Sequence, residues 1–231
     1  MGLILPALLV GLVLYFYWLK IRTEPPEVLL ARGIQTQNSG SIEKAIELYG
    51  KVLERDPANH FAHYNLAQIH NDRGKYSQAQ AGYQSALKSK PDFLDARLNL
   101  GVVLYRQRQF PAAAEAFRDV LKVSPSHPQA LFNLGITLIE LGQIDQAIEW
   151  LNASLRENPK NVQAHYYLGL AFGRIGQRAK ARAALQQALA LDPRYAPAYT
   201  ELAKIYQAEG EQRLTDQARA KASELSSTPQ K

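Results

Sequence analysis

The sequence has 231 residues, of which 46% are hydrophobic and 21% charged, a balance typical of folded proteins and not of disordered chains. The absence of cysteine excludes disulfide bonds, thiolate metal sites and cysteine nucleophiles. The formal net charge of +6 is spread without a dense basic block, so no nucleic-acid partner is expected, because phosphate binding needs clustered cations.

The first apolar segment, residues 2–19, contains no charged side chain and as a helix would span about 27 Å of a bilayer. Four consecutive aromatic residues, 15–18, lie near its end, as in an interfacial belt, and Lys20 and Arg22 follow the segment. A cleaved signal peptide is disfavoured, because it needs positive charge before the apolar run and small residues at a cleavage site. The pattern predicts a single-pass transmembrane helix over 2–19 and a short juxtamembrane linker over 20–25.

The two cations after this segment predict its orientation through the positive-inside rule. The rule places the body of the chain in the cytoplasm, with the N-terminus outside. A body on the periplasmic or lumenal side is the alternative.

Prolines recur every 34 residues through the rest of the chain. Because the residue before proline avoids helical dihedrals, each proline marks the end of a helix. The prolines are Pro57, Pro91, Pro125, Pro159 and Pro193. The spacing defines repeats over 26–59, 60–93, 94–127, 128–161 and 162–195, a partial capping repeat over 196–225, and a disordered tail over 226–231.

Each repeat reads as two helices joined by a turn. Glycine holds the fifteenth place of every repeat except the third, where Arg108 stands, and glycine suits a helix C-terminus. The eighth place is always glycine or alanine, and the twentieth is alanine in the five complete repeats, so the two helices can approach closely. Large apolar residues fill the twenty-fourth place of the complete repeats.

This order of leucine, small residue, alanine, aromatic residue and proline over 34 residues resembles the tetratricopeptide-repeat (TPR) family. The resemblance covers residues 26 to about 224 and departs from the pattern in the terminal repeats, where Arg32 and Thr215 replace a leucine and an alanine. It implies an all-α fold, a right-handed TPR superhelix of helix-turn-helix repeats preceded by the transmembrane helix.

In the resembled fold, the first helix of each repeat lines a concave groove. Its sixth place holds Asn65, Asn99 and Asn133, whose amides can bond a peptide backbone, although they can also serve solubility alone. The fifth and ninth places form an apolar stripe that either faces a ligand or packs in the core. The resemblance implies a peptide-binding groove made of Tyr64, Asn65, Gln68, Leu98, Asn99, Val102, Arg106, Phe132, Asn133, Ile136, Tyr166, Tyr167, Leu170 and Arg174.

The sequence holds no HExxH, Gly-rich phosphate loop or GxSxG motif, so we expect no catalytic, cofactor or metal site and no small-molecule substrate. We expect a membrane-tethered TPR scaffold or adaptor that binds a partner protein or peptide and acts in the assembly or recruitment of a membrane-associated complex. The alternatives are a self-assembling structural protein, which would form a homo-oligomer, and an envelope assembly factor that faces the periplasm or lumen.

Overall fold

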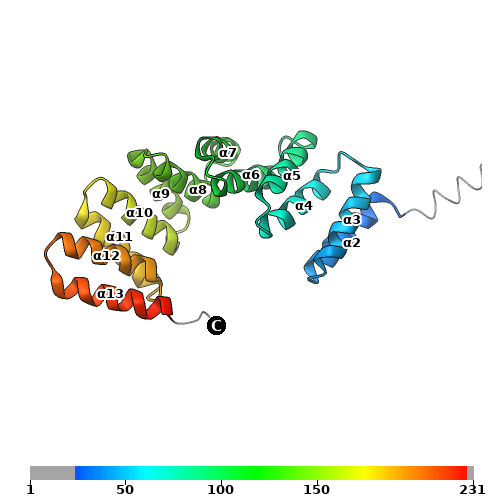
Figure 1. Cartoon of the computed structure of the whole chain (residues 1–231). Helices are drawn as coiled ribbons and strands as arrows, with labels where there is room; N and C mark the ends of the chain where they lie inside the picture. The colour runs from blue at the N-terminus through cyan, green and yellow to red at the C-terminus, as the bar shows by residue number, and fades with distance from the viewer. Residues whose placement is uncertain (1–23, 228–231) are drawn as a thin grey trace, which may run out of the picture. The chain divides into compact units, whose positions relative to one another are not determined.

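The computed structural model describes residues 24–227, which form twelve α-helices and no strand (Figure 1). The predicted all-α class is confirmed for these residues. The predicted transmembrane helix over 2–19 lies outside them, as does most of the predicted linker. Within residues 24–227, no helix combines the length and the apolar character that a membrane span requires.

The chain divides after Ala96 into two compact units. The first unit contains α2 (Pro26–Asn38), α3 (Ile42–Arg55), α4 (His60–Asp72), α5 (Tyr76–Ser89) and the first residues of α6 (Leu94–Arg106). Its core includes Leu29, Leu48 and Val52, which are almost wholly buried between α2 and α3. These apolar residues of α2 and α3 are thus buried where the two helices pack together.

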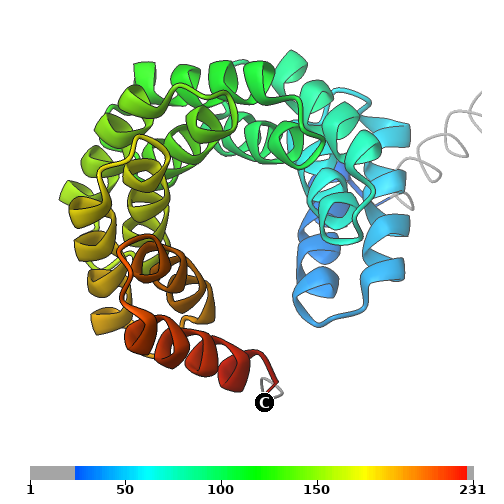
Figure 2. The ribbon, with the colours of Figure 1, turned by 60° about the vertical axis from the view of Figure 1, so that its left-hand side comes forward.

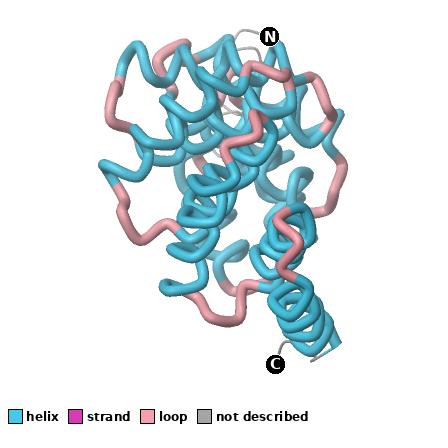
Figure 3. Tube along the Cα trace, turned by 90° about the vertical axis from the view of Figure 1, so that its left-hand side faces the viewer, coloured by secondary structure: helices cyan, strands magenta, loops and turns pink. Residues whose placement is uncertain are grey.

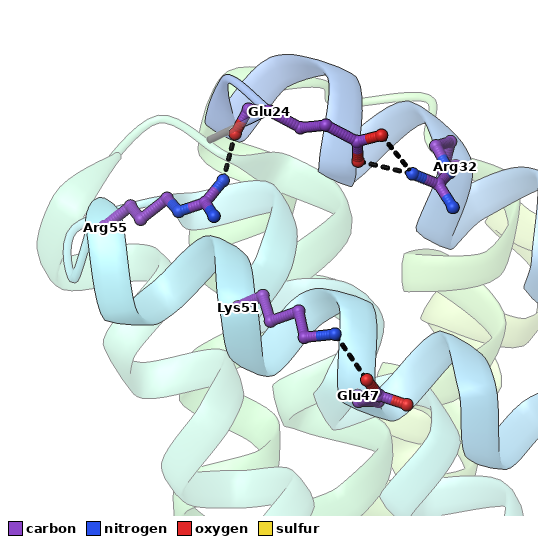
Figure 4. Close-up of polar contacts among 5 residues, drawn as sticks. All are labelled: Glu24, Arg32, Glu47, Lys51 and Arg55. Atoms are coloured by element: carbon purple, nitrogen blue, oxygen red, sulfur yellow. Dashed lines mark hydrogen bonds and ion pairs between the residues drawn. The ribbon is translucent and has the colours of Figure 1, made fainter. Parts of the chain in front are cut away.

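Ion pairs lie at the N-terminal end of this first unit. Arg32 on α2 pairs with the carboxylate of Glu24, and Arg55 on α3 donates a hydrogen bond to the main-chain oxygen of Glu24 (Figure 4). Lys51 and Glu47 form a further pair one turn apart on α3. Because these side chains are about half exposed, each pair adds little stability by itself.

The second unit contains the remainder of α6 and the seven helices that follow. These are α7 (Phe110–Val123), α8 (Pro128–Glu140), α9 (Ile144–Glu157), α10 (Val162–Arg174), α11 (Arg178–Leu191), α12 (Ala196–Ala208) and α13 (Gln212–Ser227). Successive helices run side by side in opposite directions, as α12 and α13 show at the C-terminal end of the unit (Figure 2). Phe117, Leu134 and Leu151 are at most 1% exposed in its core.

Short loops connect the helices (Figure 3). In every repeat except the third, the turn glycine adopts a positive φ, for example 74° at Gly142, which an L side chain rarely adopts. Between repeats, Asn59 and Asn161 cap the next helix, because their side-chain oxygens accept hydrogen bonds from the amides of Ala62 (3.0 Å) and Ala164 (3.1 Å).

The last helix differs from the prediction at its end. Helix α13 continues to Ser227, whereas the sequence places the end of the last repeat at residue 225 and a tail from 226. The hydroxyl groups of Ser226 and Ser227 donate to the main-chain oxygens of Ala222 (2.8 Å) and Glu224 (2.9 Å). Helix α13 thus includes two serines that composition alone assigns to a tail.

Candidate functional site

A groove of about 670 Å³ lies in the second unit, between α6, α8 and the start of α10, and we call it the amide groove. Six of its lining side chains are amides, five are apolar, and Lys160 is the one ionisable residue among them. The lining is Leu98, Asn99, Val102, Pro128, Gln129, Phe132, Asn133, Asn158, Lys160, Asn161, Val162 and Gln163.

Five predicted groove residues line the amide groove. Leu98 and Val102 are one turn apart on α6, beside Asn99, and Phe132 and Asn133 occupy the matching turn of α8. The 34-residue repeat places the two asparagines at equivalent positions of adjacent first helices. The sequence pattern therefore brings amide and apolar side chains to one surface of the second unit, although Leu98 is only 6% exposed and belongs mainly to the core.

A second cavity of about 550 Å³ lies between α10, α11 and α12, and we call it the basic pocket. Predicted groove residues Tyr166, Leu170 and Arg174 contribute to it from α10. The complete lining is Tyr166, Gly169, Leu170, Gly173, Arg174, Arg178, Leu185, Glu201, Lys204, Ile205 and Ala208.

Aromatic side chains connect the two cavities along α10. The ring of Tyr167 lies 5.8 Å from the ring of Phe132 and 5.2 Å from the ring of Tyr166, both at steep angles. Burial, followed by the nearby Glu201, raises the pKa of Tyr166 to about 12. Tyr166 is therefore neutral at physiological pH and can donate a hydrogen bond.

Arg174 has a structural contact in addition to its place in the basic pocket. Its guanidinium donates a hydrogen bond of 2.6 Å to the main-chain oxygen of Ile139, in the last turn of α8. The positive charge thus lies at a helix C-terminus, where the partial charge of the backbone is negative.

Ile136 and Arg106 differ in their surroundings. Ile136 is 8% exposed and belongs to the core of the second unit. At this residue the apolar stripe therefore packs in the core and does not face a ligand. Arg106 is exposed in the last turn of α6. Neither residue lines the amide groove or the basic pocket.

The predicted groove residues of the first unit lie on α4 and are half-buried. Tyr64 packs its ring 4.8 Å from that of Phe93, and Gln68 donates a hydrogen bond of 3.0 Å to the hydroxyl of Tyr64. Asn65 lies between them in the chain and is half-buried. Tyr64 and Gln68, at the fifth and ninth places of the second repeat, thus contact each other on α4.

Several lining residues are absent from the predicted set. Gln129 and Gln163 occupy the second place of their repeats, on the same helix face as the predicted residues, so the periodicity held a signal for them. Lys160 and Asn158 belong to the loop before α10, and a helical periodicity carries no signal for loop residues. Within residues 24–227, no three His, Asp or Glu side chains are grouped as metal ligands.

Two family models match the sequence. A tetratricopeptide-repeat model matches residues 103–162 and 135–196, and a model described as surface lipoprotein assembly modifier, N-terminal TPR repeats, matches residues 29–117. Comparison with curated proteins gives no match.

Solved structures share the fold at low identity. PilW, a type IV pilus biogenesis factor, is 22% identical with a TM-score of 0.74, over 84% of this chain and 90% of PilW. Pseudomonas aeruginosa pilF is 19% identical with a TM-score of 0.70, over 84% and 88% of the two chains. YrrB, a TPR protein with an unusual peptide-binding site, is 23% identical with a TM-score of 0.68, over 74% and 88%. The predicted tetratricopeptide repeats are therefore confirmed over residues 29–196 of the chain.

Proposed function

We propose that this protein is an adaptor whose amide groove binds an extended segment of a partner protein. The observation that carries the proposal is the lining of the groove, in which six amide side chains accompany five apolar ones. Side-chain amides donate to and accept from a peptide backbone, and the apolar surfaces receive the side chains of the bound segment. The proposal includes no catalytic step and no cofactor.

The compared proteins support a role in binding and assembly. The YrrB structure is described by its peptide-binding site, PilW as a pilus biogenesis factor, and one matching model by surface lipoprotein assembly. We extend this role to the present chain as assembly or recruitment of a membrane-associated complex.

Tethering is the second part of the proposal. Residues 2–19 would anchor the adaptor in a membrane, with the repeats on the cytoplasmic side, because Lys20 and Arg22 follow the apolar segment. A C-terminal fusion to a reporter that is active on only one side of the membrane tests this orientation. A signal from the periplasmic or lumenal side would contradict it and favour an envelope assembly factor.

Photocrosslinking in cells tests the binding role of the amide groove. A photoreactive residue at Gln129, which is exposed and lines the groove, is compared with one at Glu149, which is exposed on α9. We expect Gln129 to capture a discrete partner protein that Glu149 does not capture. Asn99→Ala combined with Asn133→Ala should abolish the adduct, because these two lining amides are lost.

The outcome that contradicts peptide binding is equally specific. If both probes capture only copies of this protein, or nothing, the groove holds no partner segment. A self-assembling structural protein would then be the better description, and light scattering of the detergent-solubilised chain would show a defined oligomer.

A further inference from the structure

The basic pocket lies where the fifth repeat departs from the four before it. The first residue of the second helix is Ile42, Tyr76, Phe110 and Ile144 in these four repeats, and each is half-buried. In the fifth repeat this position is Arg178, which is exposed and lines the pocket. A cation therefore replaces a packed apolar side chain at the edge of the cavity.

Gly173 is the second departure at the same cavity. It lies in the last turn of α10, and a Cβ atom built on it would meet no atom within 4 Å, so neither close packing nor a turn requires glycine there. Glycine is less favourable than alanine in a helix. The equivalent residues of the two preceding repeats are Tyr105 and Ile139, and the absence of such a side chain leaves the pocket open.

The charges of the lining favour an anion. Three cations and one carboxylate line the pocket, a net charge of +2, and the carboxylate of Glu201 already pairs with Lys204 at 2.7 Å. Arg178 has no side-chain hydrogen-bond or ion-pair partner anywhere in residues 24–227. It also lies in the first turn of α11, where the helix dipole is positive, so the backbone does not neutralise the charge of the guanidinium.

The floor of the pocket is apolar. Leu170 and Ile205 come from two different helices and supply aliphatic surface beside the charged residues, whereas Leu185 is fully buried behind the lining. A ligand that matches both parts presents an aliphatic side chain to the floor and a carboxylate to Arg178. A purely charged ligand would leave the aliphatic surface unused, and a purely apolar one would leave Arg178 without a partner.

Helix α10 connects the pocket to the amide groove. Gln163 lines the groove, whereas Leu170 and Gly173 line the pocket on the same helix. Ten residues of helix separate Gln163 from Gly173, about 15 Å, which an extended peptide covers in roughly five residues. One bound segment is therefore long enough to occupy both sites.

We propose that the basic pocket selects partner segments carrying an aliphatic residue next to an aspartate or glutamate, about five residues from the part bound in the amide groove. This inference rests on the proposed function, because it specifies the chemistry of the same partner. The aliphatic residue enters the space left by Gly173, and the acidic residue pairs with Arg178. The pocket thus adds selectivity to a groove whose amides read mainly the peptide backbone.

Selection from a random dodecapeptide library displayed on phage tests the inference on the full chain in detergent. We expect enriched peptides to share an aspartate or glutamate beside leucine or isoleucine. Arg178→Glu should weaken their binding, measured by fluorescence anisotropy, by about tenfold or more, because attraction becomes repulsion. Arg156→Glu is the matched control, since Arg156 is exposed on α9 outside both cavities, and it should leave affinity unchanged.

A second variant separates loss of selectivity from loss of fold. Arg178→Ile restores the residue type of the earlier repeats, so we expect a folded protein, verified by circular dichroism, that binds peptides without preference for an acidic residue. Enriched peptides without acidic residues, or unchanged affinity in Arg178→Glu, would overturn the inference while peptide binding stands. Failure to enrich any peptide would overturn both the inference and the proposed function.

Discussion

The ring of Phe117 occupies the space beside Gly101, where a Cβ atom would lie 2.6 Å from Phe117 Cε1. Gly101 is on α6 and Phe117 on α7, and both are buried. Gly101→Ala therefore forces the ring or the helix to move, and we expect a loss of about 1–3 kcal/mol in the free energy of unfolding. Urea denaturation of the full chain in detergent, followed by circular dichroism, measures this loss.

Gly173→Ala is the matched control for this change. It adds the same methyl group to a helical glycine, but into open space. We expect it to raise the free energy of unfolding by about 0.5–1 kcal/mol, because alanine is the better helix former. Equal effects of the two substitutions would show that close packing at Gly101 is not what requires glycine.

Arg108→Gly should stabilise the second unit. Arg108 has a φ of 61° at the turn position where the other repeats have glycine. A non-glycine residue in this conformation costs about 1–2 kcal/mol, and glycine removes that cost. The guanidinium also lies 5.8 Å from the ring centroid of Phe110, a contact worth about 0.5–1 kcal/mol that the substitution loses. We expect a small net gain, measured as a rise in Tm.

The opposite change at an equivalent turn is the control. Gly142 has a φ of 74°, and Gly142→Ala places a side chain in the conformation that Arg108 already adopts. We expect a fall in Tm. If Arg108→Gly lowers Tm as well, the contact with Phe110 outweighs the backbone strain.

The repeat architecture could be read from the sequence because proline and glycine act locally. Proline restricts the residue before it, and the turn glycines adopt dihedrals that other residues avoid, so their spacing encodes helix ends without reference to the rest of the fold. The amide groove could be predicted in part for the same reason, since Asn99 and Asn133 occupy equivalent places of one helical period.

Exposure of the apolar places could not be predicted in this way. Phe132 lines the groove and Ile136 is buried in the core, although both belong to one face of α8. The difference depends on which neighbouring helices cover each turn. The basic pocket depends likewise on three helices. The sequence predicts its residues on α10 as part of the groove, but only the comparison of Arg178 and Gly173 with equivalent residues indicates a separate pocket.

Substitutions on α8 should separate folding from binding. Ile136→Ala removes buried aliphatic groups, and we expect a loss of about 2–4 kcal/mol in the free energy of unfolding. Asn133→Ala changes a half-buried residue of the groove lining, and we expect the free energy of unfolding to change by no more than about 1 kcal/mol while crosslinking from Gln129 weakens, because one of the two lining amides is lost. Urea denaturation and photocrosslinking of the same variants distinguish the two effects. A large loss of stability in Asn133→Ala would make it a structural residue.

Tyr49→Phe should reduce the alkaline sensitivity of the first unit. Tyr49 is fully buried, and burial raises the pKa of its phenol to about 12, above the value near 10 of an unfolded chain. The stability due to the neutral phenol is thus fully present below pH 10 and is lost as the pH rises through 12. This one group lowers the free energy of unfolding by at most about 1.4 kcal/mol per pH unit. Urea denaturation from pH 8 to 12 measures it.

Gln37→Ala tests whether burial or hydrogen bonding causes the effect. The phenol of Tyr49 donates a hydrogen bond of 2.7 Å to the side chain of Gln37, so both Tyr49→Phe and Gln37→Ala should cost about 0.5–1.5 kcal/mol at pH 7. Only Tyr49→Phe removes the titrating group. We therefore expect the fall in the free energy of unfolding between pH 10 and 12 to persist in Gln37→Ala and to become smaller in Tyr49→Phe. A slope that decreases equally in both variants would assign the raised pKa to the hydrogen bond instead of to burial.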